Sequence, residues 1–285
     1  MKKLALTFAF ILALSPIAFS QISDLEKSAL LDLYKSTKGT TWNTNWDLTK
    51  DVAFWYGITV ENNKVTEINL SMNNLTGSIP ATIGNLTSLR HLNLGFNKIS
   101  GTIPTELATI ESLETIQLFM NQLEGQIPAA IGNLKNLKEL VLFNNFISGN
   151  LPESIYALTN LEILHISSNN LSGSISPSIK NLHHLQTLSL FDNAMSGNLP
   201  AQIGDLTNLT ELSLANNSFE GTIPTEFSKL SKLETLLLIN NKFTGQISPS
   251  IQKLPKLLNF EYNNSNDVEV SSRYSNPITQ VLISQ

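Results

Sequence analysis

The chain contains no cysteine among its 285 residues. Disulfide bonds, thiolate catalysis and cysteine-ligated metals are therefore excluded. Histidine is nearly as scarce: there are four, and only His183 and His184 are neighbours, so the sequence offers no compact histidine site for a metal. We accordingly predict neither a metal nor any other cofactor.

Charged residues are also few, at 14% of the chain, and lysine and arginine form no cluster. The formal net charge is −5. Nucleic acids and anionic membranes attract clustered basic side chains, so we expect this acidic chain to bind neither. Hydrophobic residues make up 41% of the sequence, which is enough to bury a substantial core.

No segment of the sequence is long and apolar enough to span a bilayer. The apolar run over residues 4–14 is too short, and Ser15 and a proline follow it. Two lysines precede the run and small residues stand before Gln21, which is the pattern of an export signal. We therefore predict a signal peptide over residues 1–20, cleavage between Ser20 and Gln21, and a protein without a transmembrane segment that is secreted or held at the cell surface.

The strongest signal is a repeat of 24 residues. An asparagine recurs in phase eight times, a glycine follows each one four residues later, and a proline follows the glycine in six turns. Ser176 and Ser248 replace the proline in the other two turns. Such a repeat predicts a solenoid, in which each turn buries its apolar residues against the next turn. The asparagines are Asn73, Asn97, Asn121, Asn145, Asn169, Asn193, Asn217 and Asn241.

Each repeated position has a physical role. Leu92 and Leu94 are separated by one residue, which is the spacing of a strand with one buried face. Strands of successive turns would lie about 4.8 Å apart and form a parallel sheet. The asparagine amide can satisfy backbone groups where the coil bends. Glycine permits a backbone conformation that side chains block, and proline fixes an extended stretch. We interpret these residues as scaffold.

The turn resembles the plant-type leucine-rich repeat, L-x-x-L-x-x-L-x-L-x-x-N-x-L-x-G-x-I-P, over residues 65–264, with eight full turns and a degenerate ninth. The resemblance implies an α/β repeat solenoid, a right-handed horseshoe with a parallel β-sheet on its concave face. In that family the concave face binds peptides, proteins or glycans. Because a solenoid must cover both ends of its core, residues 21–64 and 265–285 are predicted to be caps.

The N-terminal cap is expected to begin with a helix. Ser23 and Glu26 have the spacing of a capping box. An apolar stripe follows, and Gly39 would stop the helix. The stripe consists of Leu25, Leu30, Leu33 and Tyr34, and the rings expected to plug the open core of the first turn are Trp42, Trp46, Phe54, Trp55 and Tyr56.

The segment over residues 55–59 resembles the plant cap motif C-x-W-x-G-V-x-C. Ala53 and Val60 stand where that motif has its cysteines, so the resemblance implies a cap held by packing and a bacterial secreted member of the family. At the other end, the ninth turn keeps its apolar phase but loses the repeated asparagine at Ser265 and the next leucine at Asp267. Residues expected to cover the last turn are Val268, Val270, Ile278, Val281 and Ile283.

Apolar and aromatic side chains gather at the outward positions of the predicted sheet in turns two to six. Exposed patches of this kind, rimmed by polar groups, mark binding sites. We expect a protein or peptide ligand, with a glycan as the alternative; the same rings would also suit packing against one another along the sheet. The predicted site comprises Phe96, Gln117, Phe119, Met120, Val141, Phe143, Asn144, His165, Ser167, Phe191 and Asp192.

Three other functions compete with ligand binding by this face. His165, Ser189 and Asp192 lie near one another in the predicted sheet, but an open sheet offers no oxyanion hole, so we predict no enzyme. The repeats also resemble plant polygalacturonase inhibitors, which makes inhibition of a polysaccharide-degrading enzyme an alternative. The third is ice binding by small polar residues beside the glycines, which Glu124 and Glu220 interrupt. These residues are Thr76, Ser78, Ser100, Thr102, Ser148, Asn150, Ser172, Ser174, Ser196 and Asn198.

Overall fold

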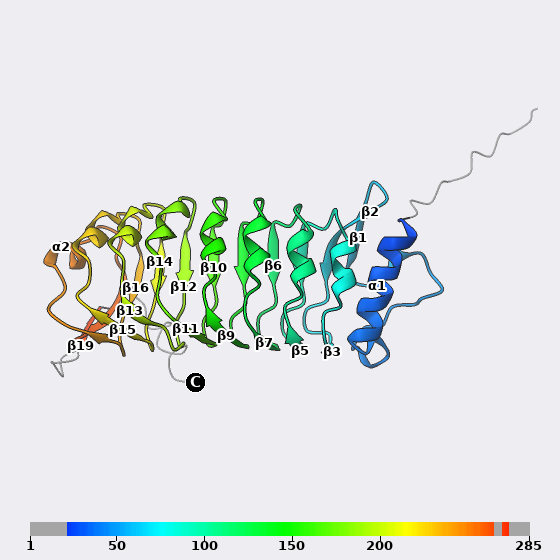
Figure 1. The fold of residues 1–285 in the computed structure, drawn as a ribbon, viewed down its shortest axis with the longest axis horizontal. Coiled ribbons are helices and arrows are strands. Elements are labelled where there is room, and N and C mark those ends of the chain that lie inside the picture. Colours follow the sequence, from blue (N-terminus) through cyan, green and yellow to red (C-terminus); the bar gives the residue numbers. More distant parts are fainter. Residues whose placement is uncertain (1–21, 265–269, 274–285) are drawn as a thin grey trace, which may run out of the picture.

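Each 24-residue repeat forms one turn of a solenoid, and the turns stack along the long axis of the molecule (Figure 1). The computed structural model describes residues 22–264 and 270–273. The predicted signal peptide therefore lies outside the described residues, as do Ser265, Asp267 and most of the residues expected to cover the last turn. Within the described ranges, no helix has the length and apolar character needed to cross a membrane.

An eleven-stranded sheet runs the length of the solenoid. Its nine central strands are parallel and in register, so that Leu92 pairs with Ile116 and Ile116 with Leu140. Antiparallel strands β1 (Ile58–Glu61) and β19 (Val270–Arg273) close its two ends. The central strands are β2 (Lys64–Asn69), β4 (His91–Asn93), β6 (Thr115–Gln117), β8 (Glu139–Val141), β10 (Ile163–His165), β12 (Thr187–Ser189), β14 (Glu211–Ser213), β16 (Thr235–Leu237) and β18 (Asn259–Asn263).

The glycine side of each turn forms strands as well, which the sequence pattern did not predict. These strands make a five-stranded sheet and a separate three-stranded sheet. The first contains β3 (Thr76–Gly77), β5 (Lys98–Thr102), β7 (Gln122–Gly125), β9 (Phe146–Asn150) and β11 (Asn170–Ser172), and the second β13 (Ser196–Asn198), β15 (Ser218–Gly221) and β17 (Lys242–Phe243). At the repeat glycines the backbone is left-handed, as at Gly101 (φ +78°), which is where a side chain would be strained.

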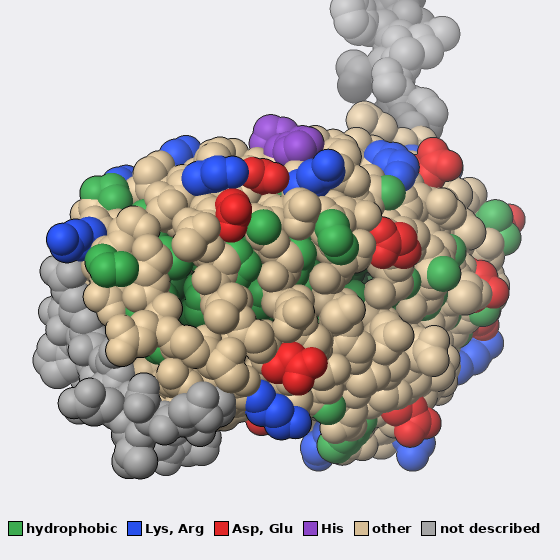
Figure 2. All heavy atoms as spheres, turned by 60° about the vertical axis from the view of Figure 1, so that its left-hand side comes forward, with side chains coloured by type: hydrophobic (Ala, Val, Ile, Leu, Met, Phe, Trp, Pro, Cys, Tyr) green, Lys and Arg blue, Asp and Glu red, His purple; other side chains and the backbone are tan. Residues whose placement is uncertain are grey.

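A short helix follows each proline position and closes the turn. Proline cannot donate a backbone hydrogen bond, and the first residues of a helix need none from it. The 3₁₀ helices are η3 (Ala81–Asn85), η4 (Thr105–Thr109), η5 (Ala129–Asn133), η6 (Glu153–Ala157), η7 (Pro177–Asn181), η8 (Ala201–Asp205) and η9 (Thr225–Lys229), and the eighth turn has the α-helix α2 (Pro249–Gln252). On the face in Figure 2, hydrophobic side chains gather in a band below a border where basic, acidic and histidine side chains lie.

The repeated asparagines form the expected ladder between turns. The Asn121 side-chain Nδ2 donates to the backbone oxygens of Leu94 (3.0 Å) and Leu118 (3.1 Å), and its Oδ1 accepts from the N–H of Ile99 (2.9 Å). Leu94 belongs to the preceding turn and Leu118 to the same turn, so one amide joins two turns. At the first turn, Asn73 exchanges two hydrogen bonds with the backbone of Thr44 in the cap instead (2.7 and 3.1 Å).

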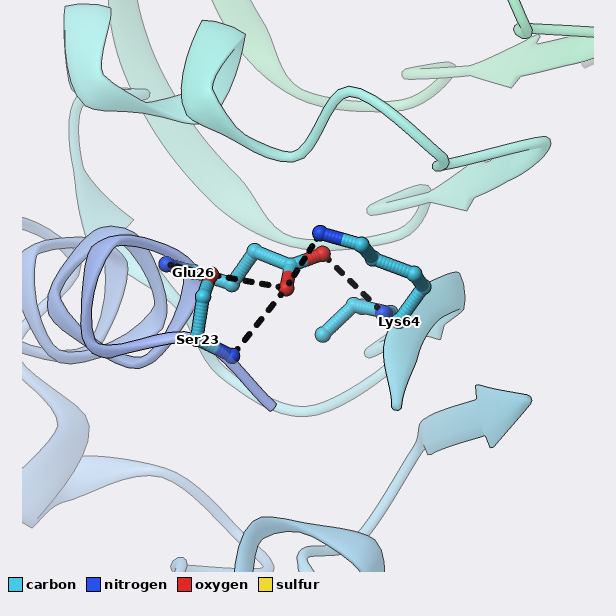
Figure 3. A network of polar contacts seen from close by, with 4 residues as sticks. Ser23, Glu26 and Lys64 are labelled. Atoms are coloured by element: carbon cyan, nitrogen blue, oxygen red, sulfur yellow. Dashed lines mark hydrogen bonds and ion pairs between the residues drawn. The ribbon is translucent and has the colours of Figure 1, made fainter. Parts of the chain in front are cut away.

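The first helix, α1 (Asp24–Ser36), lies across the end of the stack. Its capping box is present as predicted: Ser23 Oγ accepts from the N–H of Glu26, and the Glu26 carboxylate accepts from Ser23. The same carboxylate is 1% exposed, accepts from the N–H of Val65 (3.3 Å) and lies 3.5 Å from Lys64 Nζ (Figure 3). Glu26 thus ties the helix to the first repeat.

Two expectations for this helix were wrong. Leu25 is 59% exposed rather than part of the buried stripe, because neighbouring residues in an α-helix point about 100° apart and its neighbour Glu26 faces the repeats. The helix ends at Ser36, before Gly39, because Thr37 caps it by bonding to Leu33 O through both its N–H and its hydroxyl. Gly39 instead begins the short 3₁₀ helix η1 (Gly39–Thr41), packed beneath the ring of Tyr34.

The aromatic plug of the cap contains fewer rings than predicted. Trp42, Trp46 and Trp55 are buried and pack on one another, with centroids 4.9 Å and 4.6 Å apart. Phe54 and Tyr56 are exposed, which corrects the expectation that they plug the core. Their neighbour Trp55 has an extended backbone and points inward, so the residues on either side point outward. In the ninth turn Leu257, Phe260 and Tyr262 are buried, as their apolar phase predicts.

Candidate ligand-binding face

The large sheet presents every second side chain to solvent, because side chains alternate across a strand. We call these outward positions, with the two outward positions that follow each strand, the concave face. In turn two they are His91, Asn93, Gly95 and Phe96. In-register pairing stacks equivalent residues of successive turns into columns, so the concave face consists of four parallel columns of side chains.

Four rings form a continuous stack across turns two to five, which we call the aromatic stack. Phe96 meets Phe119 edge to face, with centroids 5.9 Å apart. Phe119 and Phe143 are nearly parallel at 4.9 Å and 13°. The imidazole of His165 continues the stack on Phe143, at 4.6 Å and 24°. Stacked rings hold one another in place, so the face offers a preformed apolar ridge.

Gly95 makes room for this stack. It occupies the column position held by Phe119 and Phe143 in the next two turns. A Cβ atom added to Gly95 would stand 2.6 Å from Cε1 of the Phe119 ring, which is closer than real contacts allow. The ring of Phe119 therefore leans over Gly95 and toward Phe96. The absence of one side chain thus sets the direction of the stack.

The predicted site residues share one face, but their exposure differs. Phe96 is 47% exposed, and Asn144 and Asp192 are also exposed. Ser167 is only 5% exposed and shares a hydrogen bond with Ser189 (2.8 Å), so its hydroxyl is not presented to a ligand as we expected. The half-buried members are Gln117, Phe119, Met120, Val141, Phe143, His165 and Phe191.

The same contacts give the serine and the histidine considered for catalysis other partners. Ser189 is buried and its hydroxyl bonds to Ser167, while the His165 ring lies against Phe143. Burial also lowers the pKa of the His165 imidazole. Neither side chain is paired with the other in the way a nucleophile and its base must be. Within the described residues, no group of three His, Asp or Glu side chains has a geometry that could hold a metal.

Besides the predicted Asp192, this face has three carboxylates that sequence reasoning missed. In the eight full turns the concave face contains Glu67, Glu139, Asp192 and Glu211, and it contains no lysine or arginine. Glu139 accepts a hydrogen bond from Gln117 (3.1 Å), and burial raises the pKa of the Glu211 carboxyl. Counting charges in the outward columns would have found this asymmetry, which gives the face a negative potential.

One column has a left-handed backbone in every turn. Four turns place asparagine or aspartate there, which tolerate a positive φ, namely Asn144, Asp192, Asn216 and Asn240, and a fifth has the small Ser168. The first three turns instead have Met72, Phe96 and Met120, with φ of 56°, 56° and 51°. For such bulky residues this conformation costs roughly 1–2 kcal/mol each. The strain is concentrated at the N-terminal end of the concave face.

A surface hollow of about 440 Å³ lies at that end. Met72, Phe96 and Met120 line it, together with Lys98 and the amides of Asn43, Asn74 and Asn97. Lys98 Nζ donates to Asn74 Oδ1 (3.1 Å), so the cation is held at the border of the hollow. The hollow adjoins the aromatic stack through Phe96.

Family models match almost the whole of the repeat region. A model described as a leucine-rich repeat region matches residues 120–215, and two leucine-rich repeat models match 63–123 and 208–230 with 232–254. The chain belongs to the leucine-rich-repeat family. No curated protein matches this leucine-rich-repeat chain.

Solved structures that resemble the chain include plant receptor ectodomains. One is that of GASSHO1/SCHENGEN3 from Arabidopsis thaliana in complex with CASPARIAN STRIP INTEGRITY FACTOR 2 (35% identity, TM-score 0.76, 81% of this chain and 29% of that chain). Another is Arabidopsis HAESA with a peptide hormone ligand (32%, TM-score 0.71, 82% and 39%). The SOBIR1 ectodomain from Arabidopsis thaliana is shorter (27%, TM-score 0.51, 61% and 92%). The chain spans about a third of the length of the first two structures. Its repeats are similar to those of plant receptors.

Proposed function

We propose that this protein acts outside the cell as a binding module and that its concave face holds a protein or peptide ligand. The aromatic stack carries the proposal, because four adjacent rings on an open sheet offer apolar area that folding alone leaves half-exposed. Aromatic anchors of this kind dominate binding energies at protein interfaces. The peptide hormone in the HAESA structure supports the same ligand class.

The proposal assigns a role to each part of the chain. Residues 1–20 direct export, residues 21–64 and 265–285 cover the ends of the core, and the repeats present the ligand site. The function is recognition rather than catalysis. Ligand contacts come from Phe96, Gln117, Phe119, Met120, Val141, Phe143, Asn144, His165, Phe191 and Asp192, with Ser167 forming part of the floor beneath them.

A display experiment tests the proposal. The exported chain is immobilised and screened against random peptides displayed on phage, with a glycan array run in parallel. The double variant Phe119→Ala, Phe143→Ala removes the centre of the aromatic stack. Phe146→Ala is the matched control, because Phe146 is a 58% exposed ring in β9, outside the concave face.

We expect enriched peptides to bind the unmodified chain and the Phe146→Ala control, and to bind the double variant at least tenfold more weakly. Equal binding to all three proteins would place the ligand elsewhere and overturn the proposal. Binding of glycans alone, lost in the double variant, would keep the site but overturn the peptide as its ligand. Circular dichroism confirms that each variant retains the fold.

A further inference from the structure

Three strained side chains stand together at one end of the concave face. Met72 and Phe96 are 68% and 47% exposed, so burial in this chain does not offset their left-handed backbone. Asparagine or aspartate relieves that strain at the same position in four other turns. Strain that the fold does not need is concentrated at functional sites. A ligand that covers these side chains would give them a role.

The lining of the hollow that they share favours an aromatic group. Its walls are two thioethers, a phenyl ring and the side-chain amides of Asn43, Asn74 and Asn97, with the Lys98 ammonium at the border. Thioethers pack well against aromatic rings, and a lysine ammonium is attracted to the face of a ring. An aromatic side chain satisfies both. A basic side chain is disfavoured there, because Lys98 would repel it.

The opposite charge lies further along the same column. Asp192 is exposed, and it is four turns beyond Phe96. At the strand spacing of the sheet, four turns correspond to about 19 Å. An extended peptide rises about 3.3 Å per residue, so the same distance spans about six residues. No ion pair to Asp192 is present among the described residues, so its carboxylate is available to a cation.

We propose that the ligand is an extended peptide that places an aromatic side chain in the hollow between Met72, Phe96 and Met120 and a basic side chain, about six residues away, against Asp192. This inference rests on the proposed function, since it names the ligand of the same face. The aromatic stack lies between the two contacts and supports the middle of the peptide.

Synthetic peptides test the spacing directly. Each has one tryptophan and one arginine in an uncharged background of serine and glutamine. The two residues are separated by two, six or ten positions, and each separation is made with tryptophan first and with arginine first. A fourth set has aspartate in place of arginine at the six-residue spacing. Fluorescence anisotropy with the exported chain measures the affinities. We expect the peptide whose tryptophan and arginine are six positions apart to bind at least tenfold more tightly than the peptides with the other separations. It should also bind at least tenfold more tightly than the peptide with aspartate in place of arginine.

Variants then separate ligand contact from folding. Met72→Asn and Phe96→Asn relieve the backbone strain at these positions, so we expect a midpoint of thermal unfolding that is unchanged or higher. Both variants should bind the peptide with the six-position separation at least tenfold more weakly. Asp192→Asn keeps a residue that tolerates the left-handed backbone, and we expect it to abolish the preference for arginine. Phe146→Asn, an exposed ring outside the hollow, is the control and should bind normally.

Different experimental outcomes would overturn this inference and the proposed function. Affinity that does not depend on spacing, or that survives Met72→Asn and Phe96→Asn, overturns the inference. If the Phe119→Ala, Phe143→Ala variant still fails to bind the peptides enriched by phage display, the concave face remains the binding site. Its ligand is then another class of peptide. A lower thermal midpoint in Met72→Asn would show that the methionine serves the fold, which also overturns the inference.

Discussion

The phenolic oxygen of Tyr156 accepts a hydrogen bond from the backbone N–H of Ser176, at 3.1 Å. Tyr156 is 2% exposed, and burial raises the pKa of its hydroxyl. Six turns have a proline at the position of Ser176, and proline has no N–H to donate. The departure from the repeat at Ser176 therefore supplies the donor that the buried tyrosine oxygen needs.

Tyr156→Phe is expected to lower the free energy of unfolding by about 1–3 kcal/mol, because the N–H of Ser176 loses its partner. Ser176 has φ −73°, which proline adopts without strain. Ser176→Pro should consequently cost about 1 kcal/mol less in the Tyr156→Phe background than in the native chain. Denaturant unfolding of the four proteins measures this coupling. Additive effects would mean that the hydrogen bond contributes no stability.

The asparagine ladder gives a second prediction. Asn145 makes hydrogen bonds to Leu118 O, Leu142 O and the N–H of Leu123, each 3.0 Å long. Asn145→Ala leaves these buried groups unpaired, so we expect a loss of about 3 kcal/mol in the free energy of unfolding. Asn160→Ala removes one hydrogen bond at an exposed site and should cost less than about 1 kcal/mol. Similar losses from both would contradict the ladder's role.

Glu26 offers a test of how the cap is attached. Glu26→Ala removes the carboxylate that binds Ser23 and the N–H of Val65, so we expect a loss of about 2–3 kcal/mol. Hydrogen exchange should show the effect as faster exchange in α1 and β2, with the central turns unchanged. Ser28→Ala, at an exposed position of α1, is the control. Uniformly faster exchange along the whole chain would show that the cap and the repeats unfold as one unit.

His165 predicts a pH dependence of stability. Burial lowers its pKa, so the unfolded chain binds a proton more readily than the folded chain does. Stability should therefore rise with pH from the lowered folded-state pKa up to the ordinary value of about 6.5, and be level above it. His165→Phe keeps a ring on Phe143 and removes the titration. The unfolding free energy of the native chain minus that of the variant should rise with pH and become constant above about pH 7. A value that falls with rising pH would contradict the prediction.

The features that the sequence predicted correctly are those that the repeat enforces. Leu92 and Asn121 have the same environment in every turn, so spacing alone places them inward or on the ladder. The aromatic column was also readable, because Phe119 and Phe143 are 24 residues apart. A period of two at the strand is enough to decide which side chains face solvent.

Other features depend on contacts that the period does not contain. Ser167 is buried, and its hydroxyl shares a hydrogen bond with Ser189 in the next turn. Leu25 and Phe54 belong to the cap, which occurs once and offers no pattern to compare. The strain at Met72 was hidden because a sequence shows which residues occupy a column but not the sign of φ there.

In-register pairing of the central strands has a consequence for how such a molecule can evolve. The main contacts of each turn are with the turns beside it, and the joint between any two turns has the same form. Duplication or deletion of one 24-residue unit would lengthen or shorten the molecule by one strand spacing and recreate the joint that it interrupts. The distance between a hydrophobic anchor at one end and a charge further along is therefore adjustable in whole steps, without redesign of the interior.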